Sequence, residues 1–237
     1  MPLRVAFDID GVVADMRSAL VREAEVLFGR ALSLALDGDD DRPLEGLNHR
    51  ERQRLWRQIA TIENFWETLE ETEEGAVMRI AACASKRRWD VLFITQRPAT
   101  AGDAAQTQTQ RWLRDKGFPL PAVYVVRRSR GAIAEALGLD AVVDDQMKNC
   151  LDVVADSHAR PLLVCREGEA SGPAVPAGLA GSRPAPVTLV RSIDECLEVL
   201  EALSDVRLQT SISDRAAGSG RFVRPGPLPR WCSRCQE

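Results

Sequence analysis

Six short apolar runs recur along the sequence, and stretches with helical periodicity separate most of them. Each run is apolar at consecutive positions, which is typical of parallel strands that helices cover on both faces. The runs span Arg4–Ile9, Asp90–Thr95, Ala122–Val126, Ala141–Val143, Pro161–Cys165 and Val187–Val190. Amphipathic stretches lie near residues 74–88, 103–117, 130–138, 147–157 and 192–203. This alternation predicts an α/β fold with a doubly wound, mainly parallel sheet.

One long interval interrupts the alternation. About 80 residues separate the first two apolar runs, whereas a simple crossover between parallel strands needs only about a dozen. The interval is helical over Met16–Gly29 and Asn48–Ile62. We therefore predict an α/β core over residues 1–15 and 86–203, with a small helical cap over residues 16–85 inserted after the first strand. Residues 204–237 carry little periodicity and are expected to form an extended or partly disordered tail.

The balance of ionisable residues restricts the chemistry. The chain has 35 Asp and Glu residues but only two histidines, His49 and His158. Most zinc hydrolases and Ser-His-Asp enzymes need histidine at the reaction centre, so these classes are disfavoured. A net charge of −4 argues against binding a DNA or RNA polymer through bulk positive charge. An enzyme with this composition is expected to work through carboxylates.

The ends of the chain carry few targeting signals. The first residues include Asp8 and Asp10, which is unlike a signal peptide. No apolar run approaches the roughly 18 residues of a membrane-spanning helix, so we expect a cytoplasmic protein without membrane contact.

The pair Cys232 and Cys235 has CxxC spacing but no second pair nearby. It is interpreted as half of an intermolecular zinc site or as an incidental feature of the tail.

Polar residues follow three of the predicted strands. The first strand ends in Asp8-Ile9-Asp10-Gly11, the second in Thr95-Gln96-Arg97, and the fourth in Asp144-Asp145. Ligands of open α/β sheets bind at the carboxyl ends of the strands, where these groups would meet. Crowded carboxylates repel one another and usually need a cation, and a site of oxygen ligands alone favours Mg²⁺. Each acid taken singly is equally well explained as a turn former or a helix cap.

The segments together resemble a known family. Asp8-Ile9-Asp10-Gly11-Val12-Val13-Ala14-Asp15 resembles the first motif of the haloacid dehalogenase superfamily of phosphatases. Ile94-Thr95 resembles its second motif and Val142-Val143-Asp144-Asp145 its fourth, in the same order over residues 3–165. The strings Asn64–Glu70 and Phe93–Pro98 further resemble the 5′(3′)-deoxyribonucleotidase-type branch, which carries a small helical cap between the first two motifs.

The resemblance implies a role for each motif residue. Asp8 would be the nucleophile and a Mg²⁺ ligand. Asp10 would be the general acid and base, with its backbone carbonyl on the metal. Thr95 would bind the transferring phosphoryl group, with Gln96 and Arg97 beside it as candidate phosphate or ribose contacts; Arg97 precedes Pro98, and support of the loop is an equally simple role. Asp144 and Asp145 would hold the metal directly or through water.

One position departs from the family pattern. The third motif of the family supplies a lysine near the start of the helix before the fourth strand, and Arg130 stands there in this sequence. Arginine keeps the positive charge and binds phosphate in a bidentate manner, but its reach differs from that of lysine. Arg130 is therefore a predicted phosphate-binding residue. Lys148, after the fourth motif, is an alternative source of the charge.

The cap is expected to select the substrate. Its aromatic residues Trp56, Phe65 and Trp66 are candidates for stacking on a nucleobase, and packing of a small cap is the alternative explanation. The resemblance implies a Mg²⁺-dependent phosphomonoesterase that forms an aspartyl-phosphate, with a nucleoside monophosphate as the first candidate substrate. Two alternatives stay open: a phosphatase for another small phosphorylated metabolite, or a non-catalytic binding module in which Arg130 marks the loss of activity.

Overall fold

The computed structural model of the chain describes residues 2–32, 46–166 and 187–217, with side chains described up to Arg207. Their six strands form one sheet in which all neighbouring strands are parallel, in the order β3-β2-β1-β4-β5-β6. The strands span Arg4–Asp8 (β1), Asp90–Thr95 (β2), Ala122–Val125 (β3), Ala141–Asp144 (β4), Arg160–Val164 (β5) and Thr188–Val190 (β6). The predicted doubly wound α/β fold is confirmed.

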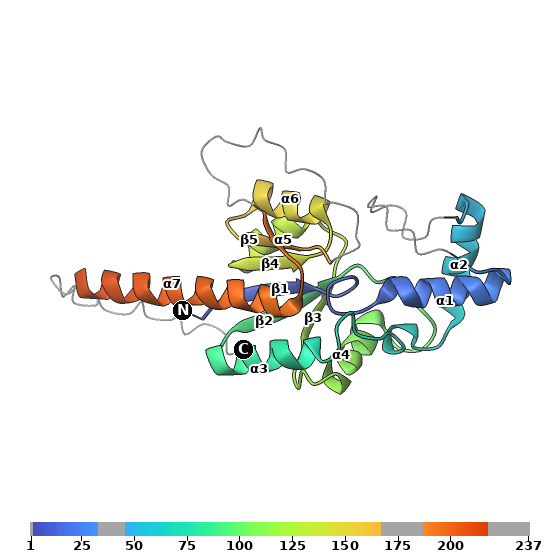
Figure 1. Cartoon of the computed structure of the whole chain (residues 1–237), viewed down its shortest axis with the longest axis horizontal. Helices are drawn as coiled ribbons and strands as arrows, with labels where there is room; N and C mark the ends of the chain where they lie inside the picture. Colours follow the sequence, from blue (N-terminus) through green and yellow to red (C-terminus); the bar gives the residue numbers. More distant parts are fainter. Residues whose placement is uncertain (1, 33–45, 167–186, 218–237) are drawn as a thin grey trace, which may run out of the picture.

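Helices cover both faces of the sheet (Figure 1). One layer holds α5 (Arg130–Leu137) and α6 (Met147–Asp156), and the other holds α3 (Ala76–Arg87), α4 (Ala105–Asp115) and α7 (Ile193–Ala217). Alternation along the strands divides the apolar side chains between the two layers. In β1, Ala6 packs with the α5 and α6 layer, whereas Val5 and Phe7 pack with the other. This two-sided burial is why the strands are apolar at consecutive positions.

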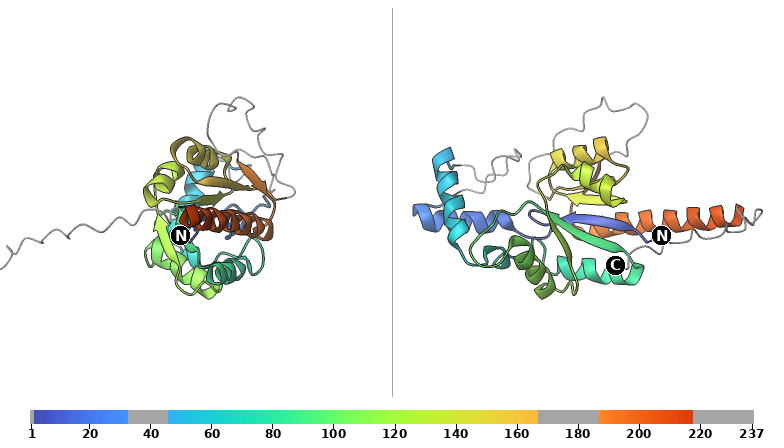
Figure 2. Two further views of the ribbon diagram at one scale, coloured as in Figure 1. Left: turned by 90° about the vertical axis from the view of Figure 1, so that its left-hand side faces the viewer. Right: turned by 180° about the vertical axis from the view of Figure 1, so that it is seen from behind.

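The inserted cap consists of α1 (Met16–Phe28), α2 (His49–Thr61) and a short 3₁₀ helix, η1 (Phe65–Glu67). Asp15 caps α1 by accepting a hydrogen bond from the Ser18 amide, and Asn48 caps α2 in a capping box with Glu51. Figures 1 and 2 show α1 and α2 beyond the carboxyl ends of the strands, at the opposite end of the molecule from the distal part of α7. The cap is thus placed over the edge of the sheet where polar residues were predicted to gather.

The structure corrects the end of the predicted cap, which was set at residue 85. Helix α3 lies beside α7, and Arg87 forms ion pairs with Glu201 at 3.2 Å and Asp205 at 2.7 Å. The Trp89 indole nitrogen also donates to Ser204 Oγ at 3.2 Å. Helix α3 therefore belongs to the core layer, and the chain returns to the core before Ala76.

The predicted start of the tail at residue 204 is also wrong for its first part, because α7 continues to Ala217. Residues 218–237, with the CxxC pair, lie outside the described residues, as do residues 33–45 and 167–186. Within the described ranges, no helix is both long and apolar enough to cross a membrane.

Candidate active site

Three neighbouring strands end in buried polar side chains. Asp8 ends β1, Thr95 ends β2 and Asp144 ends β4, and their exposed fractions are 7%, 1% and 0%. Strand β1 lies between β2 and β4, with Asp8 opposite Ile94 and Phe7 opposite Val143. The order of the strands reverses between β1 and β4, which is where open α/β sheets bind their ligands. The structure therefore brings together the residues predicted from the first, second and fourth motifs.

A tight turn carries the chain from β1 toward the cap. The Ile9 carbonyl accepts hydrogen bonds from the amides of Val13 at 2.9 Å and Ala14 at 2.8 Å. Gly11 has a φ of +89°, and a Cβ built on it would lie 1.8 Å from Asp145 Oδ2. Only glycine fits both the backbone conformation and the close approach. The Asp145 carboxylate is thus packed against the turn that follows Asp10.

Arg130 lies between the two most buried carboxylates. Its Nη2 donates to Asp8 Oδ1, and its Nε donates to Asp144 Oδ2 at 3.3 Å. Arg130 is the first residue of α5, whose N-terminus is capped by the Ser129 hydroxyl, and it is only 3% exposed. Its Nη1 is buried and has no hydrogen-bond partner among the described residues. Arg130 Nη1 is therefore a buried donor that no described acceptor satisfies.

Burial changes the acidity of both carboxylates. Burial first, and then the charge of Asp144, raise the pKa of Asp8 well above its usual value. Burial also raises the pKa of Asp144, although Arg130, the Asn149 amide and the Gln146 backbone amide all favour its charged form. Burial opposes the charge of Arg130, but Asp8 and Asp144 outweigh it and raise the pKa of the guanidinium. The arginine therefore stays charged.

Asp10 is held by a second arginine. Arg97 donates to its carboxylate from Nη2 at 2.7 Å and from Nε at 3.0 and 3.1 Å, and the Thr95 hydroxyl donates at 3.0 Å. The Arg97 side chain is fully buried; its Nη1 donates to Thr109 Oγ1 at 2.9 Å, and its guanidinium lies 4.8 Å from the Trp66 ring centre. Sequence reasoning placed Arg97 beside the site as a phosphate contact or loop support, and it missed this pairing. The sequence shows only that an arginine stands two residues after the end of β2, which does not identify its partner.

The remaining sequence candidates lie farther out. Gln96 is exposed at the rim beside Thr95, and Lys148 is exposed on the first turn of α6, so Arg130 rather than Lys148 supplies the positive charge at Asp8. Both histidines are exposed. Phe65 and Trp66 are fully buried and contact each other edge to face. The structure therefore replaces their predicted stacking on a substrate with a packing role.

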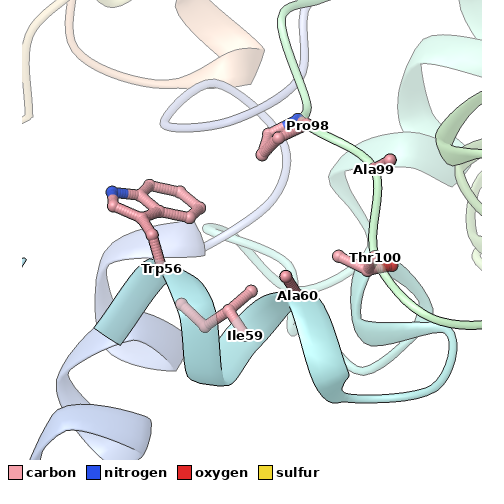
Figure 3. A pocket seen from close by; sticks show the side chains of 6 residues that line it. All are labelled: Trp56, Ile59, Ala60, Pro98, Ala99 and Thr100. Carbon is pink, nitrogen blue, oxygen red and sulfur yellow. The ribbon is translucent and has the colours of Figure 1, made fainter. Parts of the chain in front are cut away.

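Trp56, in contrast, lines a cavity of about 130 Å³ between α2 and the loop after β2 (Figure 3). The other lining residues are Ile59, Ala60, Pro98, Ala99 and Thr100. The wall is mainly apolar, and its core side begins one residue after Arg97. Of the three aromatic candidates, Trp56 is the one that the structure places at an open surface.

The charges of the site fit a divalent cation. Asp8, Asp10, Asp144 and Asp145 carry four negative charges when ionised, and Arg97 and Arg130 supply two positive charges, which leaves a net charge of −2. The four carboxylates offer only oxygen atoms as metal ligands, and oxygen is the ligand type that Mg²⁺ prefers. As the side chains lie, no group of three or more His, Cys, Asp or Glu among the described residues is arranged around a metal position. Three of the four carboxylates contact arginines instead: Asp8 and Asp144 contact Arg130, and Asp10 contacts Arg97.

Searches of the sequence against family profiles and curated proteins find no significant match. Solved structures do match. A HAD-superfamily hydrolase of subfamily IA, variant 1, from Geobacter sulfurreducens PCA is 15% identical, with 84% of this chain and 96% of that chain covered and a TM-score of 0.50. A HAD family hydrolase from Deinococcus radiodurans R1, solved with bound phosphate and sodium, is 16% identical over 87% and 97% of the two chains, with a TM-score of 0.48.

A haloacid dehalogenase-like family hydrolase from Xanthomonas campestris is 14% identical over 86% of this chain and 96% of that chain, with a TM-score of 0.47. These structural neighbours are HAD-superfamily hydrolases, and the fold assignment rests on the first of them. None of these three structures assigns the chain to the nucleotidase-type branch rather than to another branch of the superfamily. The chain has the α/β fold of the haloacid dehalogenase superfamily hydrolases.

Proposed function

We propose that the protein is a phosphomonoesterase that works through an aspartyl-phosphate on Asp8. The observation that carries this proposal is the position of Arg130, whose guanidinium contacts Asp8 and Asp144 and keeps a free donor in Nη1. An Arg130 side chain turned to solvent would instead have favoured the alternative of a non-catalytic binding module. From this position the guanidinium would supply positive charge to a phosphoryl oxygen next to Asp8.

The residues support a two-step reaction. An Asp8 carboxylate oxygen attacks phosphorus, the bond from phosphorus to the ester oxygen breaks, and Asp10 gives a proton to the departing alkoxide. Water then attacks the same phosphorus while Asp10 takes its proton, and Asp8 is released with inorganic phosphate. Thr95 and Arg130 would hold the phosphoryl oxygens. In the present structure Arg97 and Thr95 fix the orientation of Asp10.

Mg²⁺ is part of this proposal because the donor chemistry and the net charge fit it. Asp8, Asp144, Asp145 and the Asp10 carbonyl are the groups that would hold the ion. When bound, the ion would neutralise charge on the phosphoryl oxygens.

The cavity beside Trp56 would receive one part of the leaving group and not the whole of it. Sites for drug-sized ligands usually measure roughly 300–1,000 Å³, whereas this cavity measures about 130 Å³. Such a space fits one ring or a short apolar group of a small metabolite. We propose a nucleoside monophosphate as the first candidate substrate, and another small phosphorylated metabolite as the second.

The first expected result is release of phosphate from a panel of nucleoside monophosphates, sugar phosphates and p-nitrophenyl phosphate. Activity should depend on Mg²⁺ and be lost in EDTA. Addition of Mg²⁺ should also raise the thermal midpoint of unfolding, because an ion that binds only the native state stabilises it. Absence of turnover across the panel would favour the non-catalytic module, and turnover restricted to sugar phosphates would favour the second substrate class.

The second expected result concerns Trp56→Ala. If a nucleobase stacks on this ring, the KM for a nucleoside monophosphate should rise about tenfold or more, because stacking of a base on an aromatic ring contributes about 1–3 kcal/mol. The kcat, and both constants for glycerol 3-phosphate, should stay within about twofold. Trp56→Phe should restore most of the affinity, and Arg57→Ala, an exposed neighbour on α2, is the control. Equal losses with both substrates would contradict a role in substrate selection.

A further inference from the structure

Two segments connect the cap to the core, and they run side by side. Residues 12–15 lead into α1, and residues 70–73 return from η1 toward α3. Ala14 and Glu71 form an antiparallel bridge, the Asp15 amide donates to the Glu70 carbonyl at 2.9 Å, and the Thr72 amide donates to the Val13 carbonyl at 3.0 Å. Any movement of the cap relative to the core must pass through this pair of segments.

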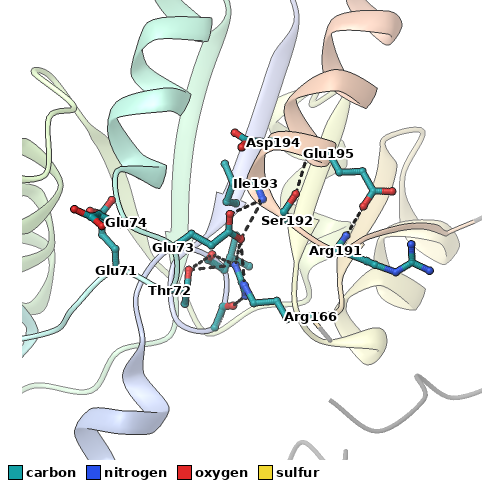
Figure 4. A network of polar contacts seen from close by, with 12 residues as sticks. Glu71, Thr72, Glu73, Glu74, Arg166, Arg191, Ser192, Ile193, Asp194 and Glu195 are labelled. Carbon is teal, nitrogen blue, oxygen red and sulfur yellow. Dashed lines mark hydrogen bonds and ion pairs between the residues drawn. The ribbon is translucent and has the colours of Figure 1, made fainter. Parts of the chain in front are cut away.

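Arg166, two residues after the end of β5, contacts both connecting segments (Figure 4). On the outgoing side, its Nη1 donates to the Gly11 carbonyl at 2.6 Å and its Nη2 to the Val12 carbonyl at 2.8 Å. On the return side, Nη2 donates to Thr72 Oγ1 at 3.1 Å and to Glu73 Oε1 at 3.0 Å. One guanidinium from the core thus holds the outgoing and the returning segment together.

Glu73 extends these contacts to α7. Its two carboxylate oxygens each accept from the Ile193 amide at 3.1 Å, and Arg79 Nη2 donates to Oε2 at 3.3 Å. Ile193 begins α7, so the carboxylate lies at the positive end of that helix. The Arg166 and Glu73 side chains are each only 21% exposed, which distinguishes this pair from a solvent-screened surface ion pair.

The position of Gly11 links these contacts to the candidate active site. Gly11 directly follows Asp10, and its Cα lies so close to Asp145 that a Cβ would lie 1.8 Å from Oδ2. Arg166 holds the carbonyl of this same residue. The guanidinium therefore sets the position of the backbone between Asp10 and the cap.

We propose that Arg166 is a positioning residue: with Glu73 it clamps the two connecting segments and thereby places the Asp10–Gly11 backbone and the cap for catalysis. The consequence for catalysis rests on the proposed phosphomonoesterase function, whereas the clamp itself does not. Lysine would reach only some of the four acceptors, because it lacks the planar fork of donors.

The test compares Arg166→Gln, Arg166→Lys and the control Arg191→Gln in the 237-residue chain. Arg191 is an exposed arginine that follows the neighbouring strand β6. Hydrogen exchange of the amides of Asp15 and Thr72 reports the clamp directly, and steady-state kinetics report its effect on turnover. In Arg166→Gln, exchange of both amides should be faster by roughly tenfold or more, because charge-assisted hydrogen bonds that oppose local opening are lost.

The same variant should lower kcat about tenfold and change the KM for p-nitrophenyl phosphate by less than about twofold, because Arg166 acts on geometry rather than on binding of this substrate. Arg166→Lys should lie between wild type and Arg166→Gln in both measurements, and Arg191→Gln should match wild type. Unchanged exchange in Arg166→Gln would overturn the clamp. Faster exchange with unchanged kcat would overturn its role in positioning. If wild type turns over no phosphoester, the proposed function fails and the exchange measurement still decides the clamp.

Discussion

Asp8→Asn is expected to lower phosphatase turnover by at least about a thousandfold, because an amide cannot replace the carboxylate as the nucleophile. The same variant should be at least as stable as wild type when no Mg²⁺ is added. Burial and the nearby Asp144 raise the pKa of Asp8, so its charge is unfavourable in the folded state. Asparagine has almost the same shape and keeps an oxygen that accepts from Arg130 Nη2.

Turnover and the thermal midpoint of unfolding in EDTA together check this expectation. Asp115→Asn is the matched control, because Asp115 is an exposed carboxylate paired with Arg114 at the end of α4. It should leave turnover and stability unchanged. Turnover near the wild-type rate in Asp8→Asn would remove Asp8 as the nucleophile, and a large loss of stability would mean that its charge helps to hold the fold.

The fold was predictable because its main determinant is local. A strand that is covered on both faces must be apolar at consecutive positions, and β1, β2, β4 and β5 satisfy this requirement in the sequence. Parallel strands also place their carboxyl ends at one edge. Asp8, Thr95 and Asp144 could therefore be grouped without knowledge of the strand order, and the structure brings them together.

The pairing of Asp10 was not predictable in the same way. Arg97 contacts side chains from three separate regions, namely Asp10, Thr109 and Trp66. No spacing rule connects these positions, because their proximity depends on how the cap and α4 pack on the sheet. Arg166 is a similar case, since it follows a predicted strand but finds its acceptors about 94 and 155 positions away, at Thr72 and Gly11. Single polar residues of this kind carry no periodic signal.

The two misplaced boundaries have different physical causes. Helix α3 is amphipathic like the cap helices, and its assignment to the core depends on packing against α7, which lies more than 100 positions later. The predicted end of helix α7 at residue 203 was too early because the apolar pattern in the sequence weakens after Leu203. Residues 204–217 contain neither glycine nor proline, and a helix that is already nucleated adds further backbone hydrogen bonds at little cost.

Arg130→Met is expected to produce the largest loss of stability among the variants considered. The substitution leaves Asp8 and Asp144 buried next to each other without the guanidinium that lies between them. Removing one partner of a buried ion pair typically costs about 3–5 kcal/mol, and for a chain of this size each kcal/mol lowers the thermal midpoint by about 2–4 °C. The midpoint in EDTA should therefore fall by roughly 6–20 °C.

Arg128→Met is the matched control, since Arg128 is exposed two residues earlier, and it should leave the midpoint unchanged. Adding Asp144→Asn to Arg130→Met should recover part of the loss, because one of the two unpaired charges is then gone. Mg²⁺ should raise the midpoint of Arg130→Met more than that of wild type, since a cation would then supply the positive charge that both carboxylates lack. An unchanged midpoint in Arg130→Met, or no recovery in the double variant, would contradict the assignment of Arg130 as the charge that allows Asp8 and Asp144 to be buried side by side.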